Sequence, residues 1–459
     1  MYHLQRKKMN ERQPKENIMG TAEVSRLVLT TGIPLMLSLL INSLYNFVDS
    51  VFVSRVAEDA LTALSLSAPV QVLVSALGLG NAVGLNAAIS KALGEKRPDK
   101  VKKIANAAIF IAFCAWILIC IACLVGINRY FAWQSGGNET IAAYGRDYLS
   151  ICMLFSLGQM GQWVFDRFVI ASGKSHLFLF TLSAASITNL ILDPVFIFGF
   201  GMGTRGAAIA TVIGQFFGMF AGIYINRRWN KEIPFSFTLK PDMKSVLTIL
   251  RVGIPSTLVQ VLTSFVTIVM NSILLAFSST AVAVYGVCSR MMGLCTVGVH
   301  GIDNGLIPIV AYNYGARKQE RITASVRWAL IYSFVFYAPF LLVLELAPGW
   351  VLRLFNASAE MMRIGYPAVR ILGAAWLVSI PALVITAALQ GLSQPMPSMI
   401  ITMLRQAVLP VILALALRPA GRLELIWTAF VIAEGVCIPV AVWFWRRNTR
   451  GRSETTEKV

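Results

Sequence analysis

Four polar residues in apolar stretches of the sequence are the strongest candidates for chemistry: Asp49, Asn189, Asp193 and Thr211. Asn189 and Asp193 stand four positions apart in "NLILDPVF" and therefore share one face of a helix. Pro194 weakens the backbone hydrogen bonding beside them. Together the four side chains supply oxygen ligands suited to Na⁺ and carboxylates that can take up protons. The pattern predicts a cation site.

The composition places these residues in a membrane. Of the 459 residues, 56% are hydrophobic and 14% are charged, whereas a soluble domain has about 45–50% apolar and about 25% charged residues. A carboxylate inside a bilayer is costly, so an intramembrane Asp is a functional-site hypothesis by default. The net charge of +18 is dispersed over many loops, which favours contact with anionic lipid and argues against nucleic-acid binding.

Twelve apolar stretches are long enough to cross a bilayer, for which about 20 residues are needed. They lie at roughly 27–54, 61–88, 104–127, 147–170, 176–200, 205–226, 251–276, 281–311, 327–347, 366–390, 396–417 and 423–445. With both termini in the cytosol, 29 of the 40 Lys and Arg residues fall on the inner side, as the positive-inside rule requires. The sequence therefore predicts an all-α protein with twelve transmembrane helices.

The chain also repeats itself, which sets the predicted domains. Shifted by 221 positions, "TGIP" at 31–34 meets "VGIP" at 252–255, and three glycines of each half coincide. Two six-helix halves of the same topology are then related by an axis along the membrane normal, with substrate bound between them. The predicted parts are a cytosolic tail (1–26), an N-terminal lobe (27–226), a cytosolic linker (227–250), a C-terminal lobe (251–445) and a cytosolic tail (446–459).

The two halves differ in their charged residues. Met270 stands at the position that corresponds to Asp49, so ion coupling should belong to the first half. The second half contains Asp303 and Glu434 together with Arg290 and Arg405. We interpret the two arginines as partners that neutralise these acids in buried pairs, in preference to a second ion site. The seven Cys all fall in apolar spans and the three His form no cluster, so we expect neither a disulfide nor a structural metal.

Three stretches carry a family resemblance: "GIPLMLSLLINSLYNFVDSVFVSRV", "NLILDPVFIFGFGMGTRGAAIATVIGQ" and "GLIPIVAYNYGA". They resemble the multidrug and toxic compound extrusion (MATE) family in its bacterial branch, through both halves of the chain. The resemblance implies two six-helix lobes, related by a pseudo-two-fold axis and arranged as a V. It also implies exchange of Na⁺ or H⁺ for organic, often cationic compounds by alternating access. The family's cation-site positions fall on Asp49, Asn189, Asp193 and Thr211, with Tyr148 as a neighbour.

The implied mechanism is antiport, in which an ion neutralises the Asp49/Asp193 pair. This changes the packing of the first span, where Pro34 supplies a weak point, and lowers the affinity for the drug. We expect the substrate cleft to be lined by Phe47, Gln159, Met160, Trp163, Tyr285, Met291 and Met292. Other branches of the family place acids in spans 7 and 10, which this chain lacks there.

Two alternatives belong to other functional classes. A lipid-linked saccharide flippase of related architecture would need a cationic cleft, and Arg290 and Arg405 are the arginines in mid-span. A membrane-embedded enzyme would need clustered acids near the surface, for which Asp166 beside Arg167 is the one close pair. We expect a transporter and no enzyme, without a cofactor other than the coupling ion. We expect it to be a monomer in the inner membrane of a bacterium, with a small organic molecule as its substrate.

Overall fold

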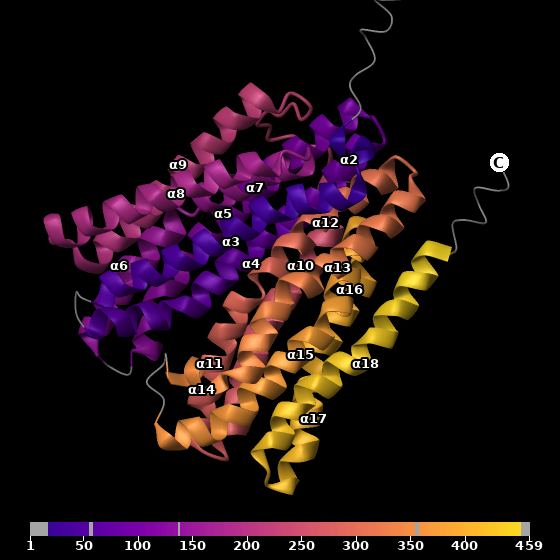
Figure 1. Ribbon diagram of the computed structural model, residues 1–459. Helices are drawn as coiled ribbons and strands as arrows, with labels where there is room; N and C mark the ends of the chain where they lie inside the picture. Colours follow the sequence, from indigo (N-terminus) through magenta and orange to yellow (C-terminus); the bar gives the residue numbers. More distant parts are fainter. Residues whose placement is uncertain (1–16, 55–57, 136–137, 354–357, 451–459) are drawn as a thin grey trace, which may run out of the picture.

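The computed structural model describes residues 17–54, 58–135, 138–353 and 358–450. Side chains of some helical residues, Phe47 and Asp49 among them, also lie outside the described part. Helices account for nearly all of the described chain (Figure 1). Ten of them are long and apolar enough to cross a membrane, and a bent helix pair can form an eleventh span.

The N-terminal half forms one bundle, drawn in indigo to magenta in Figure 1. After the short helix α2 (Ile18–Thr21), its elements are α3 (Val24–Ser54), α4 (Glu58–Gly94), α5 (Pro98–Gln134), α6 (Glu139–Leu154), α7 (Leu157–Ala171), α8 (Ser175–Pro194), the π-helical turn η1 (Val195–Gly199) and α9 (Gly203–Trp229). The fourth predicted span, 147–170, covers parts of both α6 and α7, which are separate helices. Phe131 and Phe168 are fully buried in the core of this bundle.

The C-terminal half forms the second bundle, drawn in orange to yellow. Its elements are α10 (Met243–Leu275), α11 (Ser279–Cys295), α12 (Val297–Gly315), α13 (Gln319–Leu346), α14 (Pro348–Arg353), α15 (Ala359–Gly391), α16 (Pro395–Met403), the π-helical turn η2 (Leu404–Val408), α17 (Leu409–Leu417), the 3₁₀ turn η3 (Arg418–Ala420) and α18 (Leu423–Arg450). Helices α11 and α12 meet at a bend of 51° and together occupy the eighth predicted span. Trp427 and Tyr337 are buried in this core.

Local chemistry explains several helix boundaries. The Asn138 side chain accepts hydrogen bonds from the backbone N–H groups of Thr140 and Ile141, at 3.0 and 3.2 Å, and so caps α6. Asp242 caps α10 by accepting from the backbone N–H of Ser245 at 2.9 Å and from its hydroxyl at 2.6 Å. These two bonds hold the pKa of the Asp242 carboxyl below its ordinary value. Helix α10 thus begins inside the range predicted as linker.

The two bundles cross where the repeat places glycines. A Cβ at Gly94 of α4 would lie 2.0 Å from the backbone oxygen of Tyr312 in α12. A Cβ at Gly315 of α12 would lie 2.1 Å from the backbone oxygen of Lys91 in α4. These contacts are related by the repeat, and each requires a residue without a side chain. The glycine matches between the halves therefore have a structural cause at the bundle junction.

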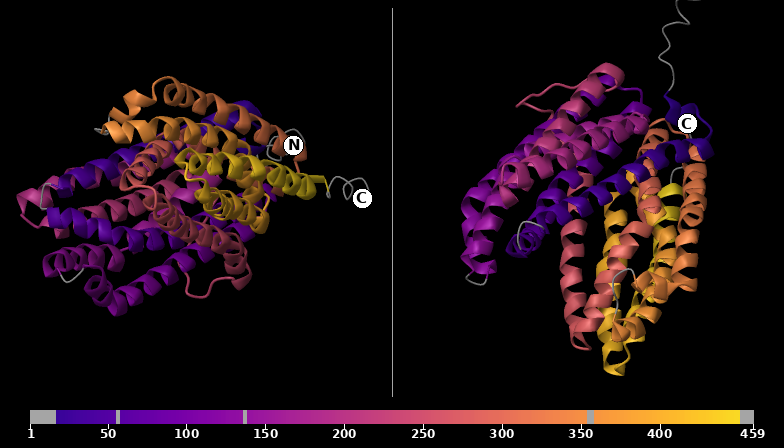
Figure 2. Two further views of the ribbon diagram at one scale, coloured as in Figure 1. Left: turned by 90° about the horizontal axis from the view of Figure 1, so that it is seen from below. Right: turned by 60° about the vertical axis from the view of Figure 1, so that its left-hand side comes forward.

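The bundles form a V that is closed at one end. Figure 2 shows them meeting at the end that carries α2 and separating toward the opposite end. At the closed end, a cavity of about 520 Å³ is lined from both bundles by Lys91, Glu95, Arg97, Lys100, Tyr314, Gly315 and Arg317. Four of the seven residues that line this cavity are basic, so this end of the V is positively charged.

A short N-terminal segment, residues 17–22, connects both bundles at the closed end. On the N-terminal side, Asn17 Nδ2 donates to the backbone oxygen of Ser172 at 3.0 Å and to Glu232 Oε2 at 2.7 Å. On the C-terminal side, the backbone oxygens of the segment accept from Asn313 Nδ2 (3.0 Å), Lys318 Nζ (2.9 Å) and Arg321 Nη2 (3.2 and 2.6 Å). Met19 is fully buried between them. The predicted tail 1–26 thus contains a folded segment.

Candidate functional site

Three of the predicted cation-site residues lie together between α8 and α9. Asn189 Nδ2 is 3.3 Å from Asp193 Oδ1, one helical turn farther along α8, and 3.2 Å from Thr211 Oγ1 on α9. Asn189 is 2% exposed and Asp193 is 0% exposed. The amide therefore holds the carboxylate and the hydroxyl in one buried polar cluster, which we call the α8–α9 site.

The neighbouring sequence explains why this cluster can form. Gly214 of α9 packs directly against Asn189, because a Cβ there would lie 3.1 Å from Asn189 Cβ and 2.8 Å from the backbone oxygen of Ala185. The close approach brings Thr211, one turn earlier on α9, to the Asn189 side chain. Directly after Asp193, Pro194 ends α8 and the π-helical turn η1 begins. Such turns are frequent at functional sites.

Tyr148 lies beside the same helices. It is 5% exposed on α6 and packs in one cluster with Ile197 of η1 and with Ala207 and Ala208 of α9. The structure thus brings the predicted neighbour to the end of α8 and α9 that carries Asp193.

Asp49 and Phe47 belong to α3, which packs along α8. Their side chains lie outside the described part of the structure, so the predicted pairing of Asp49 with Asp193 stays a prediction. Pro34 lies inside α3, and its backbone oxygen accepts from the Ser38 hydroxyl at 2.7 Å. Its role as a hinge also stays a prediction.

The α8–α9 site has the chemistry of a cation site. The Asp193 carboxylate and the Thr211 hydroxyl both lie within reach of the Asn189 amide group, which faces them with its nitrogen, and hard cations such as Na⁺ choose oxygen ligands. The Asn189 Oδ1 atom is buried and has no hydrogen-bond partner among the described residues. An amide oxygen in this situation is available to a bound cation or to a protonated carboxyl group.

Asp166 and Arg167 do not form the surface pair expected of a membrane-embedded enzyme. Asp166 is 2% exposed on α7 and accepts a hydrogen bond from the Thr181 hydroxyl of α8 at 2.5 Å. Arg167 instead reaches the other bundle, where its Nη1 donates to Asn304 Oδ1 of α12 at 3.4 Å. Asp166 is thus a second buried carboxylate of the N-terminal bundle. The cost of a carboxylate inside a membrane, which marked Asp49 as a candidate, marks Asp166 equally. The sequence predicts a place near the surface for Asp166, because Arg167 follows it.

The buried charges of the C-terminal bundle differ in part from the predicted pairs. Arg405 forms the predicted kind of pair, with its Nη1 3.0 Å from Glu434 Oε1. Arg290 is exposed on α11 and makes no ion pair with any described residue. Asp303 is 8% exposed, and its Oδ1 atom lacks a hydrogen-bond partner within the described ranges. The prediction that two arginines neutralise both acids is therefore wrong for Arg290.

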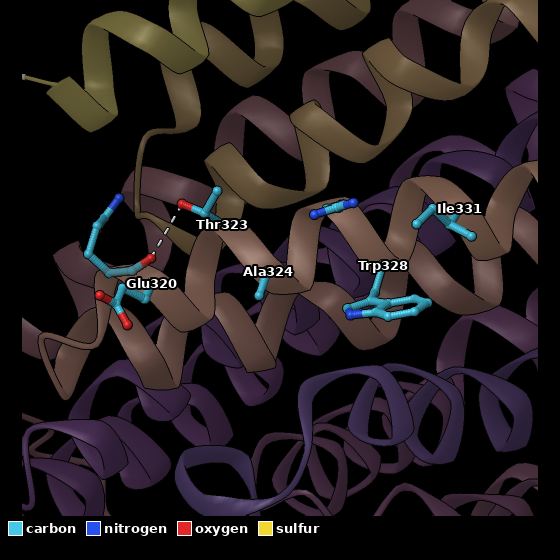
Figure 3. Close-up of a pocket in the computed structure, with 7 residues that line it drawn as sticks. Glu320, Thr323, Ala324, Trp328 and Ile331 are labelled. Atoms are coloured by element: carbon cyan, nitrogen blue, oxygen red, sulfur yellow. Dashed lines mark hydrogen bonds between the residues drawn. The ribbon is translucent and has the colours of Figure 1, made fainter.

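The predicted cleft residues occupy mixed environments. Met160 and Met292 are 1% and 4% exposed, so they pack inside their bundles. Tyr285 stacks on Trp427 with ring centroids 6.3 Å apart. Gln159, Trp163 and Met291 remain half-buried. A further cavity of about 620 Å³ lies elsewhere, along one face of α13 from Gln319 to Ile331 (Figure 3).

Each half of the chain matches the model of one protein family. The family model MatE matches residues 34–195 and again residues 255–415. The chain belongs to the MatE family. The two matches begin at Pro34 and Pro255, the prolines that the internal repeat aligns. MATE proteins form a family of transporters, not of enzymes.

Individual relatives agree with the family over nearly the entire chain. The "Multidrug export protein MepA" of Staphylococcus haemolyticus (strain JCSC1435) is 24% identical over 425 residues, which cover 92% of this chain and 93% of that protein. A multidrug resistance MATE family transporter in an outward-facing conformation has a TM-score of 0.88 at 23% identity, with 96% of this chain and 100% of that chain covered. A MOP superfamily transporter from Pyrococcus furiosus has a TM-score of 0.87 at 22% identity, with 96% and 99% covered. The predicted fold, twelve transmembrane helices in two lobes, is confirmed.

Proposed function

We propose that this MATE protein is a secondary active multidrug efflux transporter, which exchanges H⁺ or Na⁺ for organic, often cationic compounds by alternating access. The observation that carries the proposal is the buried α8–α9 site inside the N-terminal lobe. A carboxylate inside a membrane is energetically costly, so an intramembrane Asp such as Asp193 is expected to have a function. Relatives named as multidrug export proteins, such as MepA, support organic compounds as the substrate class.

The mechanism couples the ion to the arrangement of the lobes. An ion that enters from the outside binds to the carboxylates of Asp193 and Asp49 and offsets one of their two negative charges, and this changes the packing of α3 against α8. Helix α3 also crosses α12 of the other lobe at Gly32, where a Cβ would lie 3.3 Å from Ile302 Cα. A change in α3 therefore reaches the lobe junction directly. Coupling requires only that the ion and the drug favour different states by about 1–3 kcal/mol.

The closed end of the V faces the cytosol in this proposal. The helix ends and loops that gather there carry the basic residues which the positive-inside rule assigns to the inner side. With its lobes joined at this end, the structure corresponds to a state that opens to the outside of a bacterial cytoplasmic membrane. The N-terminal segment 17–22 then stabilises this state, and it must release one lobe when the inner side opens.

The flippase alternative is not favoured. A pyrophosphate group needs exposed cationic side chains in the cleft between the lobes. Of the two arginines in mid-span, Arg405 is 3% exposed and already paired with Glu434. Arg290 is exposed on α11, and one guanidinium is fewer than the cluster of cations that a pyrophosphate group needs.

Efflux from proteoliposomes tests the proposal. A fluorescent cationic dye is loaded, and an imposed H⁺ gradient and an imposed Na⁺ gradient are applied in turn. We expect one gradient to drive dye movement, and we expect Asp193→Asn and Asp49→Asn to abolish it. Asp147→Asn, which removes a charge from an ion pair with Arg205 (2.8 Å), is the matched control and should transport normally. Normal transport by Asp193→Asn would contradict the proposal.

A further inference from the structure

The basic cavity at the closed end of the V lies where the two lobes meet, and no residue of the α8–α9 site lines it. Residues between Lys91 and Lys100 line one side from the N-terminal lobe, and residues between Tyr314 and Arg317 line the other side from the C-terminal lobe. Its volume of about 520 Å³ falls within the range of about 300–1,000 Å³ that is usual for small-molecule sites. The cavity is therefore large enough for a ligand that contacts both lobes.

The charges around this cavity do not balance. Its lining contains one carboxylate, that of Glu95, and four cations, which are Lys91, Arg97, Lys100 and Arg317. The carboxylate is already used, because Lys100 Nζ lies 2.9 Å from Glu95 Oε2. Four positive charges and one negative charge leave an excess of three, and both lobes contribute to it. Since like charges repel each other, an anion between the lobes would offset a repulsion at their junction.

Arg97 and Arg317 are the two arginines of this lining, one from each lobe. Both are exposed, and neither makes an ion pair with a residue that the structure describes. Arg97 directly precedes α5, whose N-terminus has no side-chain cap, and an open helix N-terminus also favours an anion. Asp99 in the first turn of α5 is exposed and does not line the cavity. A guanidinium presents parallel N–H donors that match the oxygens of a phosphate group.

The internal repeat shows that cations in these positions bind oxygen atoms. Shifted by 221 positions, Arg97 and Lys100 correspond to Lys318 and Arg321. Lys318 Nζ and Arg321 Nη2 donate to backbone oxygens of the N-terminal segment 17–22, at distances between 2.6 and 3.2 Å. In the second half, the chain itself thus supplies the oxygen atoms. In the first half, the Arg97 side chain donates no hydrogen bond to any part of the chain that the structure describes, so a ligand can supply them.

We propose that this cavity binds a phosphate group, which joins the two lobes at the closed end. Its oxygens accept hydrogen bonds from Arg97 on one side and from Arg317 on the other, while Lys91 and Lys100 add positive charge. An anionic phospholipid and free phosphate present the same oxygen atoms, and basic pockets between membrane helices are known to bind lipid head groups. The phosphate group is therefore the shared chemistry of both sources.

The walls of the cavity are held together by contacts between the lobes. The Lys91 ammonium lies 4.9 Å from the centroid of the Tyr314 ring, across the junction. A Cβ at Gly315 would lie 3.0 Å from the backbone nitrogen of Glu95. The complete site exists only while the lobes are joined at this end, so a ligand that binds there favours the closed arrangement. If the protein is an antiporter as proposed above, the bound phosphate group slows the opening of the inner side.

Equilibrium binding measures the site without transport. The full-length protein is purified in a maltoside detergent, which contains no phosphate, and binding of radiolabelled inorganic phosphate is measured at low ionic strength. We expect Arg97→Gln and Arg317→Gln each to weaken binding roughly tenfold, because each removes one charged hydrogen-bond donor. Arg228→Gln removes an exposed arginine that does not line the cavity, and as the matched control it should bind like the wild type. Arg97→Lys and Arg317→Lys keep the charge and should retain most of the binding.

A second arm identifies the source of the phosphate group. Phosphatidylglycerol is added to the same micelles, and native mass spectrometry counts the lipid molecules that each protein molecule retains. If the lipid is the source, the wild type and Arg228→Gln should retain one more lipid than Arg97→Gln and Arg317→Gln. A loss with both cavity variants in either arm supports the inference.

The remaining outcomes would overturn it. An effect of Arg97→Gln or of Arg317→Gln alone would refute a phosphate group shared by the lobes. An equal effect of Arg228→Gln, or no binding in both arms, would refute the site. Dye efflux by the wild type is measured in parallel. Binding that depends on both arginines supports the inference even if no dye moves, whereas dye efflux without such binding refutes the phosphate site alone.

Discussion

Arg321 of α13 ties the N-terminal segment 17–22 to the C-terminal bundle at the closed end. Arg321 Nη2 donates to the backbone oxygens of Ala22 at 2.6 Å and of Met19 at 3.2 Å. A hydrogen bond from a charged donor contributes about 1.5–3 kcal/mol. Because Arg321 is half-buried, we take the lower end of this range for the pair together. Arg321→Ala should therefore weaken the closed end by about 1.5 kcal/mol, or roughly tenfold in the ratio of closed to open molecules.

Distances between spin labels across the closed end measure this ratio. Labels are placed at Arg228 on α9 and Gln319 on α13, which are both exposed, after the native thiols that are not buried are replaced by Ser (Cys114, Cys120 and Cys152). Arg321→Ala should enlarge the population with the longer distance, whereas Arg327→Ala, an exposed arginine of the same helix, should not. Equal distance distributions for Arg321→Ala and the unsubstituted protein would refute the reasoning.

Three further predictions address other contacts. Gly94→Ala should lower the thermal unfolding midpoint and open the closed end, since overpacking costs about 1–3 kcal/mol. Gly126→Ala should be neutral, because a Cβ at Gly126 meets nothing within 4 Å. Equal midpoints for the two variants would contradict the close approach at Gly94. Asn189→Ala removes the amide that holds the α8–α9 site. A loss of about 1–2 kcal/mol should weaken binding of the coupling ion roughly tenfold, measured as the ion concentration that half-saturates efflux. An unchanged half-saturating concentration would argue against this site. Glu434→Ala leaves Arg405 buried without its ion-pair partner and should destabilise the protein by about 3–5 kcal/mol. Adding Arg405→Met should recover most of this loss in the same unfolding assay. If the second substitution does not restore stability, the loss has a cause outside the ion pair.

The spans and the α8–α9 site could be predicted because each follows from a local pattern. Every predicted span overlaps a helix or a helix pair, since about 20 apolar residues suffice to indicate a crossing. Asn189 and Asp193 share a face because helical geometry fixes residues four apart. The aligned glycines of the two halves predicted the repeat, and in the structure Gly94 and Gly315 make equivalent close contacts at the bundle junction.

Other features depend on contacts that no local pattern reveals. The segment 17–22 contains a helix of only four residues, and its stability comes from groups more than 150 positions away, such as the backbone oxygen of Ser172 and the guanidinium of Arg321. The π-helical turns η1 and η2 add no hydrophobic periodicity that would mark them. Arg290 was predicted to be buried because its span is apolar, but its helix face is exposed. Composition indicates depth in the membrane, whereas the direction of a side chain depends on how the helices pack.

In antiport, ion and drug move in opposite directions through one protein. The most direct measurement uses proteoliposomes with a gradient of the cationic dye alone and an internal probe for H⁺, or for Na⁺ in a parallel preparation. Antiport predicts that dye leaving the liposomes drives one of these ions inward, and that Asp193→Asn stops both movements together. Dye movement that continues in Asp193→Asn, or that proceeds without any counter-movement of H⁺ or Na⁺, would contradict it.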